Sequence, residues 1–334
     1  RMRTRTLDGV EWRRLGDFKI DKKCDMLIAH RAPWVMQHKP AANRVFVWHH
    51  DHAYESQIWS ADYATRAEHL FVSAWQRDLL QKQLGEGVPS LRGAVIGNGV
   101  PAAQAPGLTA TLEARDRNPH GVIYASQPIR GLSVLLRIWP HVLEAIPDAT
   151  LDIFYGRHTN EVGARANKMI GEELEKIDAL LRGEHLQEIE SIGMRTTRAF
   201  AASIRDHGRV SQPQLMGEMR KASVWAYPCI YPEVSCIAGM RALSAGCIPV
   251  FASYGTALLE TQPFKGYELE GPLDEAGIAK FTELLIEALQ KTHGVGYRQM
   301  LREETLKASS WSAVTDRFLQ AIQTVDTVAK RAEG

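Results

Sequence analysis

The sequence predicts an α/β protein with two domains, each built on a parallel sheet covered by helices. Short apolar runs alternate with longer amphipathic stretches along most of the chain, which is the pattern of parallel strands joined by helices. At 334 residues, the chain is long for one hydrophobic core. Residues 101–120 have no sustained period and predict a linker. We therefore expect domains at residues 1–118 and 119–305, and a C-terminal helical run over residues 306–334.

The first domain is expected to alternate strands with helices. Its apolar residues cluster in short runs, and the stretches between these runs are amphipathic. Strands are predicted at residues 25–29, 44–49, 69–73 and 93–96, and helices at residues 55–67 and 75–84.

The second domain is expected to continue the same alternation. Residues 132–145 have a strongly apolar face and predict a helix. Residues 160–190 are charged and predict helix, which Gly163 and Gly171 weaken. Strands are predicted at residues 122–125, 150–155, 209–210, 224–227 and 247–252, and further helices at 212–222, 235–246, 276–292 and 297–331, the last with a break at 309–311.

Composition argues against several classes of function. The 40 basic and 39 acidic residues give a net charge of +1, so a dedicated nucleic-acid binder is not expected. Cys24, Cys229, Cys236 and Cys247 lack a C-x-x-C pair and zinc-site spacing, and we interpret them as reduced core thiols. No run approaches the length of a membrane span and no signal peptide opens the chain, so we expect a soluble cytoplasmic protein without a transmembrane segment.

The segment from Trp225 to Phe251 carries the strongest indication of a ligand site. It predicts a strand ended by Pro232, a helix with Ser235 as N-cap that stops at Gly246, and a second strand. Unpaired N–H groups and the helix dipole at Ser235 would hold a pyrophosphate. Glu233, just outside that anion site, would face hydroxyl groups of the ligand. Alternatively, its carboxylate only complements the helix dipole.

A second candidate lies at the turn from Tyr124 to Leu132, between a strand and a helix. Arg130 in this turn would direct a forked cation toward the same crevice, and a guanidinium binds a diphosphate in a bidentate manner. The alternative is a surface arginine that closes the turn.

Trp48-His-His-Asp-His52 follows a predicted strand directly, which is the usual ligand side of such a sheet. His50 and Asp51 would therefore contact a ligand. His50 and His52 alternate and could bind a metal, but no distant group of ligands accompanies them, so no metal site is expected. Purely structural histidines are the remaining alternative.

Together these segments resemble the retaining glycosyltransferases of GT-B architecture, in the large family often called family four. The Glu233 helix resembles the family's E-x7-E signature, the turn from Ser126 to Gly131 resembles its phosphate turn, and Asn98-Gly-Val100 resembles the N-G-[IV] before its linker. The turns at Tyr124 and Pro232, and Trp48-His-His-Asp51, are most similar to a bacterial and phage subgroup that has Y-x-S-x-P-x-R-G-L, P-E-T-S-C-I and W-x-H-D.

The resemblance implies two Rossmann-like domains that face a cleft, and the transfer of a hexose-type sugar with retention of configuration. The donor would be a sugar on a nucleoside diphosphate such as UDP or GDP, the acceptor a glycan or another hydroxyl compound, and neither metal nor cofactor would be needed. Catalytic roles fall on His50, Asp51 and Glu233, and donor binding on Ser126, Arg130, Gly131, Gly156, Val210, Glu233, Ser235, Cys236, Ile237 and Arg241.

Two departures from the family pattern leave an alternative open. Arg241 stands where the family has its second glutamate, and arginine cannot accept the hydrogen bonds that this glutamate accepts from the donor ribose. Asp8-Gly-Val-Glu-Trp12 resembles a point well inside the family's first domain, so its opening strand, glycine-rich loop and first helix are expected to be absent. The alternative is a catalytically weak GT-B-like nucleotide-binding protein, or one completed by a partner chain or a second copy. A sugar-nucleotide epimerase of the same architecture fits the turns less well.

Overall fold

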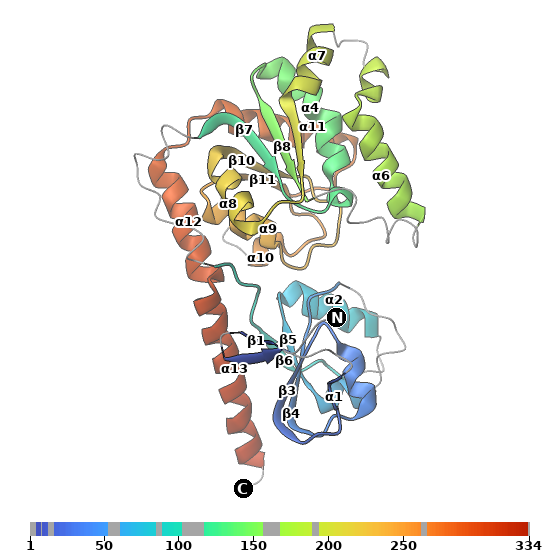
Figure 1. The fold of residues 1–334 in the computed structure, drawn as a ribbon, viewed down its shortest axis with the longest axis vertical. Helices are drawn as coiled ribbons and strands as arrows, with labels where there is room; N and C mark the ends of the chain where they lie inside the picture. Colours follow the sequence, from blue (N-terminus) through green and yellow to red (C-terminus); the bar gives the residue numbers. More distant parts are fainter. Residues whose placement is uncertain are drawn as a thin grey trace. The chain divides into compact units, whose positions relative to one another are not determined.

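The computed structural model divides the chain into two compact units, residues 1–96 and 97–334 (Figure 1). Each unit contains its own parallel sheet with helices against it. The two parallel sheets confirm the α/β class predicted from the alternation of apolar runs and amphipathic stretches. The structure describes residues 5–7, 9–12, 17–52, 61–84, 89–101, 117–155, 168–188, 194–261 and 266–332.

The first unit contains a short antiparallel hairpin and a four-stranded parallel sheet of order β3-β4-β5-β6. Strands that follow one another in the chain are neighbours in this sheet, so the order never reverses within it. The hairpin consists of β1 (Arg5–Leu7) and β2 (Val10–Trp12), and the sheet of β3 (Cys24–His30), β4 (Ala42–Trp48), β5 (Glu68–Phe71) and β6 (Gly93–Val95). The helical segments are η2 (Pro33–His38), α1 (Ala61–Arg66) and α2 (Ala74–Leu84).

All four strands predicted for the first unit are confirmed, with ends shifted by a few residues. Of the predicted helix at residues 55–67, the structure shows α1, and residues 55–60 lie outside the described residues. One expectation is wrong, because Cys24 is exposed on the edge strand β3 and is not a core thiol. The other three cysteines are free and buried as expected.

The second unit has a six-stranded parallel sheet of order β12-β11-β10-β7-β8-β9. In chain order this is the 3-2-1-4-5-6 arrangement of a Rossmann fold, and the order reverses between β7 and β10. Ligands of such sheets bind outside the carboxyl ends of the strands at the reversal. The strands are β7 (Asn118–Tyr124), β8 (Thr150–Phe154), β9 (Ile204–Gly208), β10 (Ala222–Tyr227), β11 (Ile248–Ala252) and β12 (Tyr267–Leu269).

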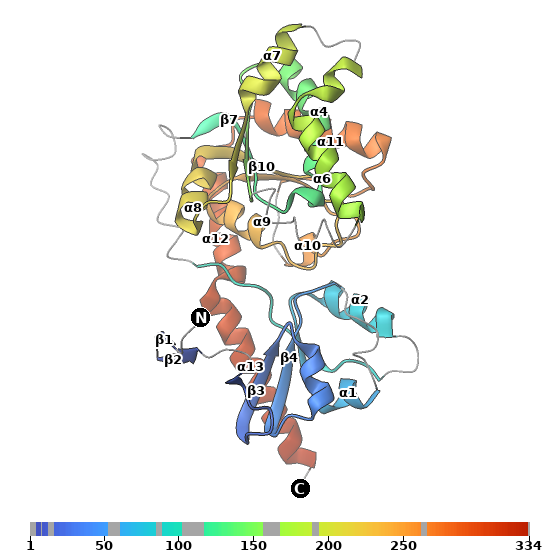
Figure 2. The same ribbon diagram turned by 45° about the vertical axis from the view of Figure 1, so that its right-hand side comes forward.

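Helices cover both faces of this sheet (Figures 1 and 2). Helices α4 and α11 pack on one face, with α6 and α7 against α4, and helices α8 and α9 pack on the other, with α12 against α9. Because both faces are covered, β10 is buried over its whole length, which explains its largely apolar sequence. The helices are α4 (Leu132–Ala145), α6 (Lys168–Leu181), α7 (Met194–Ser203), α8 (Gln212–Lys221), α9 (Ile237–Ser244), α10 (Leu258–Thr261), α11 (Glu275–Gln290), α12 (Val295–Ser309) and α13 (Trp311–Ala332), with 3-10 segments η5 (Pro128–Arg130) and η7 (Glu184–Glu188).

The predicted strand at residues 209–210 is wrong. The strand here is β9, which ends at Gly208, and Val210 lies in the turn before α8. Ser211 caps α8 in a capping box with Gln214, and this fixes where the helix begins. Strand β12 was also not predicted.

The predicted N-cap of α9 is wrong. Strand β10 ends at Tyr227, as predicted, and Pro232 lies in the loop that follows it. The N-cap of α9 is Cys236, whose Sγ accepts a hydrogen bond from the Gly239 amide at 3.3 Å, and it is not Ser235. Gly246 follows the helix with a φ of 79°, a left-handed conformation that favours glycine.

The break predicted near residue 310 is confirmed, since α12 ends at Ser309 and α13 begins at Trp311. Ser310 between them forms a β-bridge with Val100. A Cβ on Gly99 would lie 2.5 Å from the Trp311 ring, so only glycine permits this contact. Most of the predicted linker, residues 102–116, lies outside the described residues, while its last three residues belong to β7.

Candidate functional site

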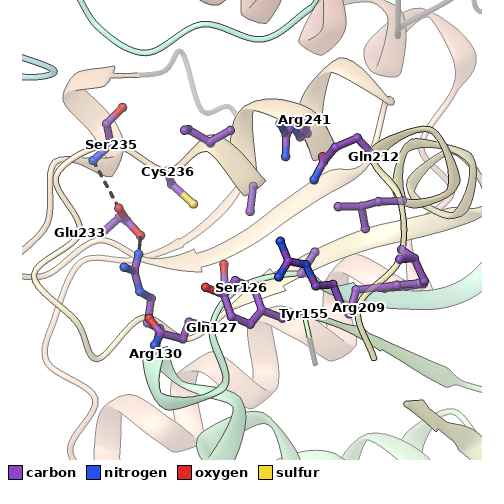
Figure 3. A pocket seen from close by; sticks show the side chains of 16 residues that line it. Ser126, Gln127, Arg130, Tyr155, Arg209, Gln212, Glu233, Ser235, Cys236 and Arg241 are labelled. Atoms are coloured by element: carbon purple, nitrogen blue, oxygen red, sulfur yellow. Dashed lines mark hydrogen bonds and ion pairs between the residues drawn. The ribbon is translucent and has the colours of Figure 1, made fainter. Parts of the chain in front are cut away.

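A pocket of about 420 Å³ lies in the second unit, at the carboxyl ends of its strands (Figure 3). Its walls come from the turn after β7, the ends of β8 and β9, the loop after β10 and the start of α9. Strands β7 and β10 flank the point where the strand order reverses, so topology alone places a ligand site here.

At one end of the pocket, Arg130 and Glu233 form an ion pair. Nη1 of Arg130 donates to Oε2 of Glu233 at 2.7 Å, and the Tyr227 hydroxyl donates to the same oxygen at 3.0 Å. The other carboxylate oxygen lies 3.4 Å from the Ser235 amide (Figure 3). Glu233 is only 5% exposed, so these donors compensate the loss of water around its charge.

The backbone around Gly131 brings Arg130 to this position. Gly131 has a φ of 129°, and a Cβ there would lie 1.9 Å from the carbonyl oxygen of Pro228. Glycine therefore lets the turn after β7 touch the loop after β10, where the Ile230 amide also bonds the Arg130 carbonyl at 3.4 Å. The Arg130 guanidinium lies over the ring of Tyr231, 4.1 Å from its centre.

The groups around Glu233 keep fixed protonation states near neutral pH. Burial disfavours the charge of Arg130, but Glu233 and neighbouring tyrosines outweigh it and raise the pKa of Arg130. Burial raises the pKa of Tyr227 well above its ordinary value, so its hydroxyl remains a donor. Burial likewise raises the pKa of the Cys236 thiol, so Cys236 is a thiol and not a thiolate nucleophile.

The first turn of α9 supplies donors beside this ion pair. Ile237 and Ala238 line the pocket, and their amides, as first-turn groups, have no acceptor within the helix. Among the described lining residues, three polar atoms are buried without a hydrogen-bond partner: Arg130 Nε, Ser235 Oγ and Arg241 Nε. Buried polar atoms without partners are uncommon, and their concentration here indicates a ligand.

The opposite end of the pocket is lined by Arg209, Gln212 and Arg241 (Figure 3). Arg209 follows β9 directly, Gln212 begins α8, and Arg241 lies in the last turn of α9. Burial lowers the pKa of Arg241. Neither arginine forms an ion pair within the described residues, so this end is positively charged.

The pocket gathers most of the donor-binding residues predicted from the sequence. Gly131 does not line it but shapes the turn that does, and Gly156 lies outside the described residues. Sequence reasoning missed Gln127, Tyr155, Arg209 and Gln212, although a cation directly after a strand, as Arg209 is, could have been noted. The predicted residues in the pocket are Ser126, Arg130, Val210, Glu233, Ser235, Cys236, Ile237 and Arg241.

His50 and Asp51, the other predicted catalytic residues, lie in the first unit at the end of β4. Arg31 binds Asp51 through both carboxylate oxygens, with Nε to Oδ2 at 3.0 Å. The His50 ring lies 4.3 Å from the His30 ring, centre to centre. Gln76 on α2 donates to the Asp51 carbonyl at 2.9 Å, so His50 and Asp51 are held by residues at the end of β3 and by a helix.

His49, the residue before His50, forms a buried pair with His69 on the neighbouring strand β5. His69 Nε2 faces the carbonyl of Ala64 at 3.1 Å and must donate to it, so its Nδ1 accepts from His49 Nε2 at 3.0 Å. Burial lowers the pKa of His69 to about 4, and burial, then His69 itself, lowers that of His49. The pair is therefore neutral and structural, as one of the alternatives for this cluster expects.

Within the described residues, no group of three or more His, Cys, Asp or Glu side chains is placed to hold a metal ion. None of the described helices combines the length and apolarity that a membrane crossing requires.

No known family profile and no curated protein matches the sequence. Solved structures match over most of the chain. The sucrose-phosphate synthase of Thermosynechococcus elongatus matches with a TM-score of 0.64 at 14% identity, over 91% of this chain and 74% of that one. A glycosyltransferase from Rickettsia africae matches with a TM-score of 0.61 at 14% identity, over 89% and 75%. The chain has the GT-B fold.

A GtfA/B complex is also similar, with a TM-score of 0.54 at 15% identity, over 85% of this chain. The chain spans about half the length of that protein, 53%. The fold predicted from the resemblance is thus confirmed. The sequence identity to these structures is so low that comparison of sequences finds no match.

Proposed function

We propose that the protein is a glycosyltransferase that moves a hexose-type sugar from a nucleoside-diphosphate donor, such as a UDP- or GDP-sugar, to a hydroxyl acceptor such as a glycan. The observation that carries the proposal is the Arg130–Glu233 pair beside the first turn of α9, at the strand-order reversal of a GT-B domain. It combines a site for an anion with an acceptor for hydroxyl groups in a single pocket.

The first turn of α9 and Arg130 bind the donor diphosphate in this proposal. The amides of Ile237 and Ala238 point at the anion, and the helix dipole favours its charge. Arg130 donates a hydrogen bond from Nη1 to Glu233, so the Nε of Arg130 remains available to donate to a phosphate. As the sugar leaves, negative charge grows on the diphosphate, and these donors stabilise it without reorganising. Metal is then not required for this step.

Glu233 positions the donor sugar. Its Oε1 has a single weak donor, the Ser235 amide at 3.4 Å, and so can accept a hydrogen bond from a sugar hydroxyl. We assign His50 and Asp51 of the first unit to the reacting sugar and the acceptor, and transfer retains the anomeric configuration, as the resemblance implies.

Calorimetric titration with UDP and GDP, followed by transfer and hydrolysis assays over a donor panel, tests the proposal. We expect binding of at least one nucleotide and turnover that EDTA does not reduce, with the product anomer read by proton NMR. Arg130→Gln removes a donor to the leaving group and should lower kcat by about 100-fold or more. The matched control Arg182→Gln removes an exposed arginine paired with Glu184 outside the pocket and should leave kcat unchanged.

A second candidate is a GT-B-like nucleotide-binding protein with little turnover. Arg241 favours it, because it replaces a hydrogen-bond acceptor expected for the donor ribose with a group that only donates. Nucleotide binding without turnover for any donor would select this candidate, and turnover would exclude it.

A further inference from the structure

The charge of the pocket is unevenly distributed. Three arginines line it, Arg130, Arg209 and Arg241, and among the described lining residues Glu233 is the one carboxylate. Arg130 already pairs with Glu233 at 2.7 Å. Two positive charges therefore remain, both at the opposite end, which we call the Arg209–Arg241 end.

Arg241 is held there at an energetic disadvantage. Its side chain is half-buried, its Nε is buried without a hydrogen-bond partner in the described part of the chain, and no carboxylate pairs with it. Removing a cation from water without a counter-ion is unfavourable. The last turn of α9 offsets part of this through its dipole, but it provides no hydrogen bond to Nε. An anion from outside would satisfy both the charge and the donor.

Arg209 approaches the same space from a different element. Figure 3 shows the two guanidinium groups on opposite sides of the pocket, away from the Arg130–Glu233 pair, with Gln212 beside Arg241. Arg209 is exposed and has no ion pair within the described residues. Two guanidinium groups and the NH2 of an amide provide enough donors for a phosphate group, and the one carboxylate among the described lining residues, Glu233, lies at the other end.

We infer that the Arg209–Arg241 end binds a second phosphate-type anion, distinct from the diphosphate at the first turn of α9. The inference rests on the proposed function and specifies its donor. With the diphosphate at α9, the nucleoside extends along the pocket toward the end of β9, where Arg209 and Val210 lie. A ribose hydroxyl there leaves both cations unneutralised, whereas a phosphate ester on the ribose neutralises them. The ligand class is a nucleoside diphosphate with an additional phosphate on its ribose, or a plain one accompanied by a free phosphate ion.

Calorimetric titration with pairs of nucleotides that differ only in phosphorylation of the ribose tests the inference. The probes are ADP against 3′-phospho-ADP, GDP against guanosine 3′-diphosphate 5′-diphosphate, and inorganic phosphate alone. We expect the ribose-phosphorylated member of at least one pair to bind about tenfold or more tightly, since a phosphate bound by two guanidinium groups is a strong contact. Arg209→Gln and Arg241→Gln should each remove this preference, because both lower the affinity for the ribose-phosphorylated nucleotide more than the affinity for the plain nucleotide.

The control is Arg205→Gln. Arg205 lies on β9 and pairs with Asp152 at 2.6 Å, outside the pocket, so its loss removes the same charge without removing the preference. Inorganic phosphate separates the two sources of the anion. If it tightens binding of plain ADP or GDP in the wild type but not in Arg241→Gln, the second anion is a free ion, and the site is confirmed.

A preference that survives in both variants, or the absence of any effect of the additional phosphate or of free phosphate, would overturn the inference. Arg209 is exposed, so its variant folds even where a change at Arg241 disturbs α9, and thermal melting checks both. Failure of the proposed function looks different: either no nucleoside diphosphate binds, with or without the additional phosphate, or nucleotides bind but no donor sugar is turned over.

Discussion

The guanidinium of Arg130 lies 2.7 Å from the carboxylate of Glu233, although the two residues are separated by 103 positions in the chain. Gly131 makes this contact possible, because it lets the turn after β7 touch the loop after β10. One ion pair thus joins the two segments that flank the reversal of the strand order. It links the stability of the pocket to the chemistry proposed for it.

Breaking this pair from one side should destabilise the second unit. Arg130→Gln leaves Glu233 charged and nearly buried, with only Tyr227 and the Ser235 amide as donors. We expect the free energy of unfolding to fall by about 2–4 kcal/mol. Urea denaturation of Arg130→Gln, Glu233→Gln and the double variant forms a complete cycle. The double variant should lose less than the sum of the single losses, and simple additivity would show that the pair is not coupled.

Gly131→Ala should disturb both stability and nucleotide binding. The added Cβ would meet the Pro228 carbonyl at 1.9 Å, so the turn that carries Arg130 must move. We expect a loss of about 2 kcal/mol or more in unfolding free energy. Gly217→Ala in α8 is the matched control, because nothing lies within 4 Å of its added Cβ, and alanine there should stabilise by about 0.5–1 kcal/mol. Equal effects of the two changes would contradict the role given to Gly131.

The fold was more predictable from the sequence than the contacts of the site. Helix α4 has the bounds predicted from its apolar face, and the buried strand β10 was recognised from its unbroken apolar run. Both signals are local. The Arg130–Glu233 pair depends on β7 lying beside β10, which only the strand order decides. The sequence therefore indicated that both side chains face a ligand but not that they bind each other.

Two of the wrong predictions have physical reasons. Strand β9 is an edge strand whose sequence, Ile-Arg-Asp-His-Gly, has almost no apolar signal. Arg205 and His207 instead bind Asp152 on the neighbouring strand, and these polar contacts hold β9 in place. The start of α9 was placed at Ser235 because serine is a common N-cap, whereas the Cys236 sulfur performs that role.

Acidification should destabilise the first unit through the buried His49–His69 pair. Burial lowers the pKa of His69 from its ordinary 6.5 to about 4. Between these values the unfolded chain binds more protons than the folded one, so stability is complete above pH 6.5 and is lost as pH falls toward 4. For His69 this amounts to about 3 kcal/mol. Hydrogen-exchange protection of β4 and β5 should therefore fall from pH 7 to 4.5, and unchanged protection would show that the pair is not neutral.

Arg241→Gln should not reduce stability in the absence of ligand. Burial lowers the pKa of Arg241. The folded state therefore disfavours the positive charge of this side chain relative to the unfolded chain, in which water solvates it. We expect a melting temperature equal to or above that of the wild type. Arg205→Gln provides the contrast, since it removes the partner of Asp152 and should lower the melting temperature. A lower melting temperature for Arg241→Gln would indicate a partner that stabilises its charge.

A crystal structure with a bound nucleoside diphosphate tests the central claim most directly. We expect the diphosphate within hydrogen-bond distance of the Arg130 guanidinium and of the amides in the first turn of α9, with the nucleoside directed toward Val210. A nucleotide bound elsewhere on the second unit, with Arg130 and α9 untouched at saturating concentration, would contradict the account.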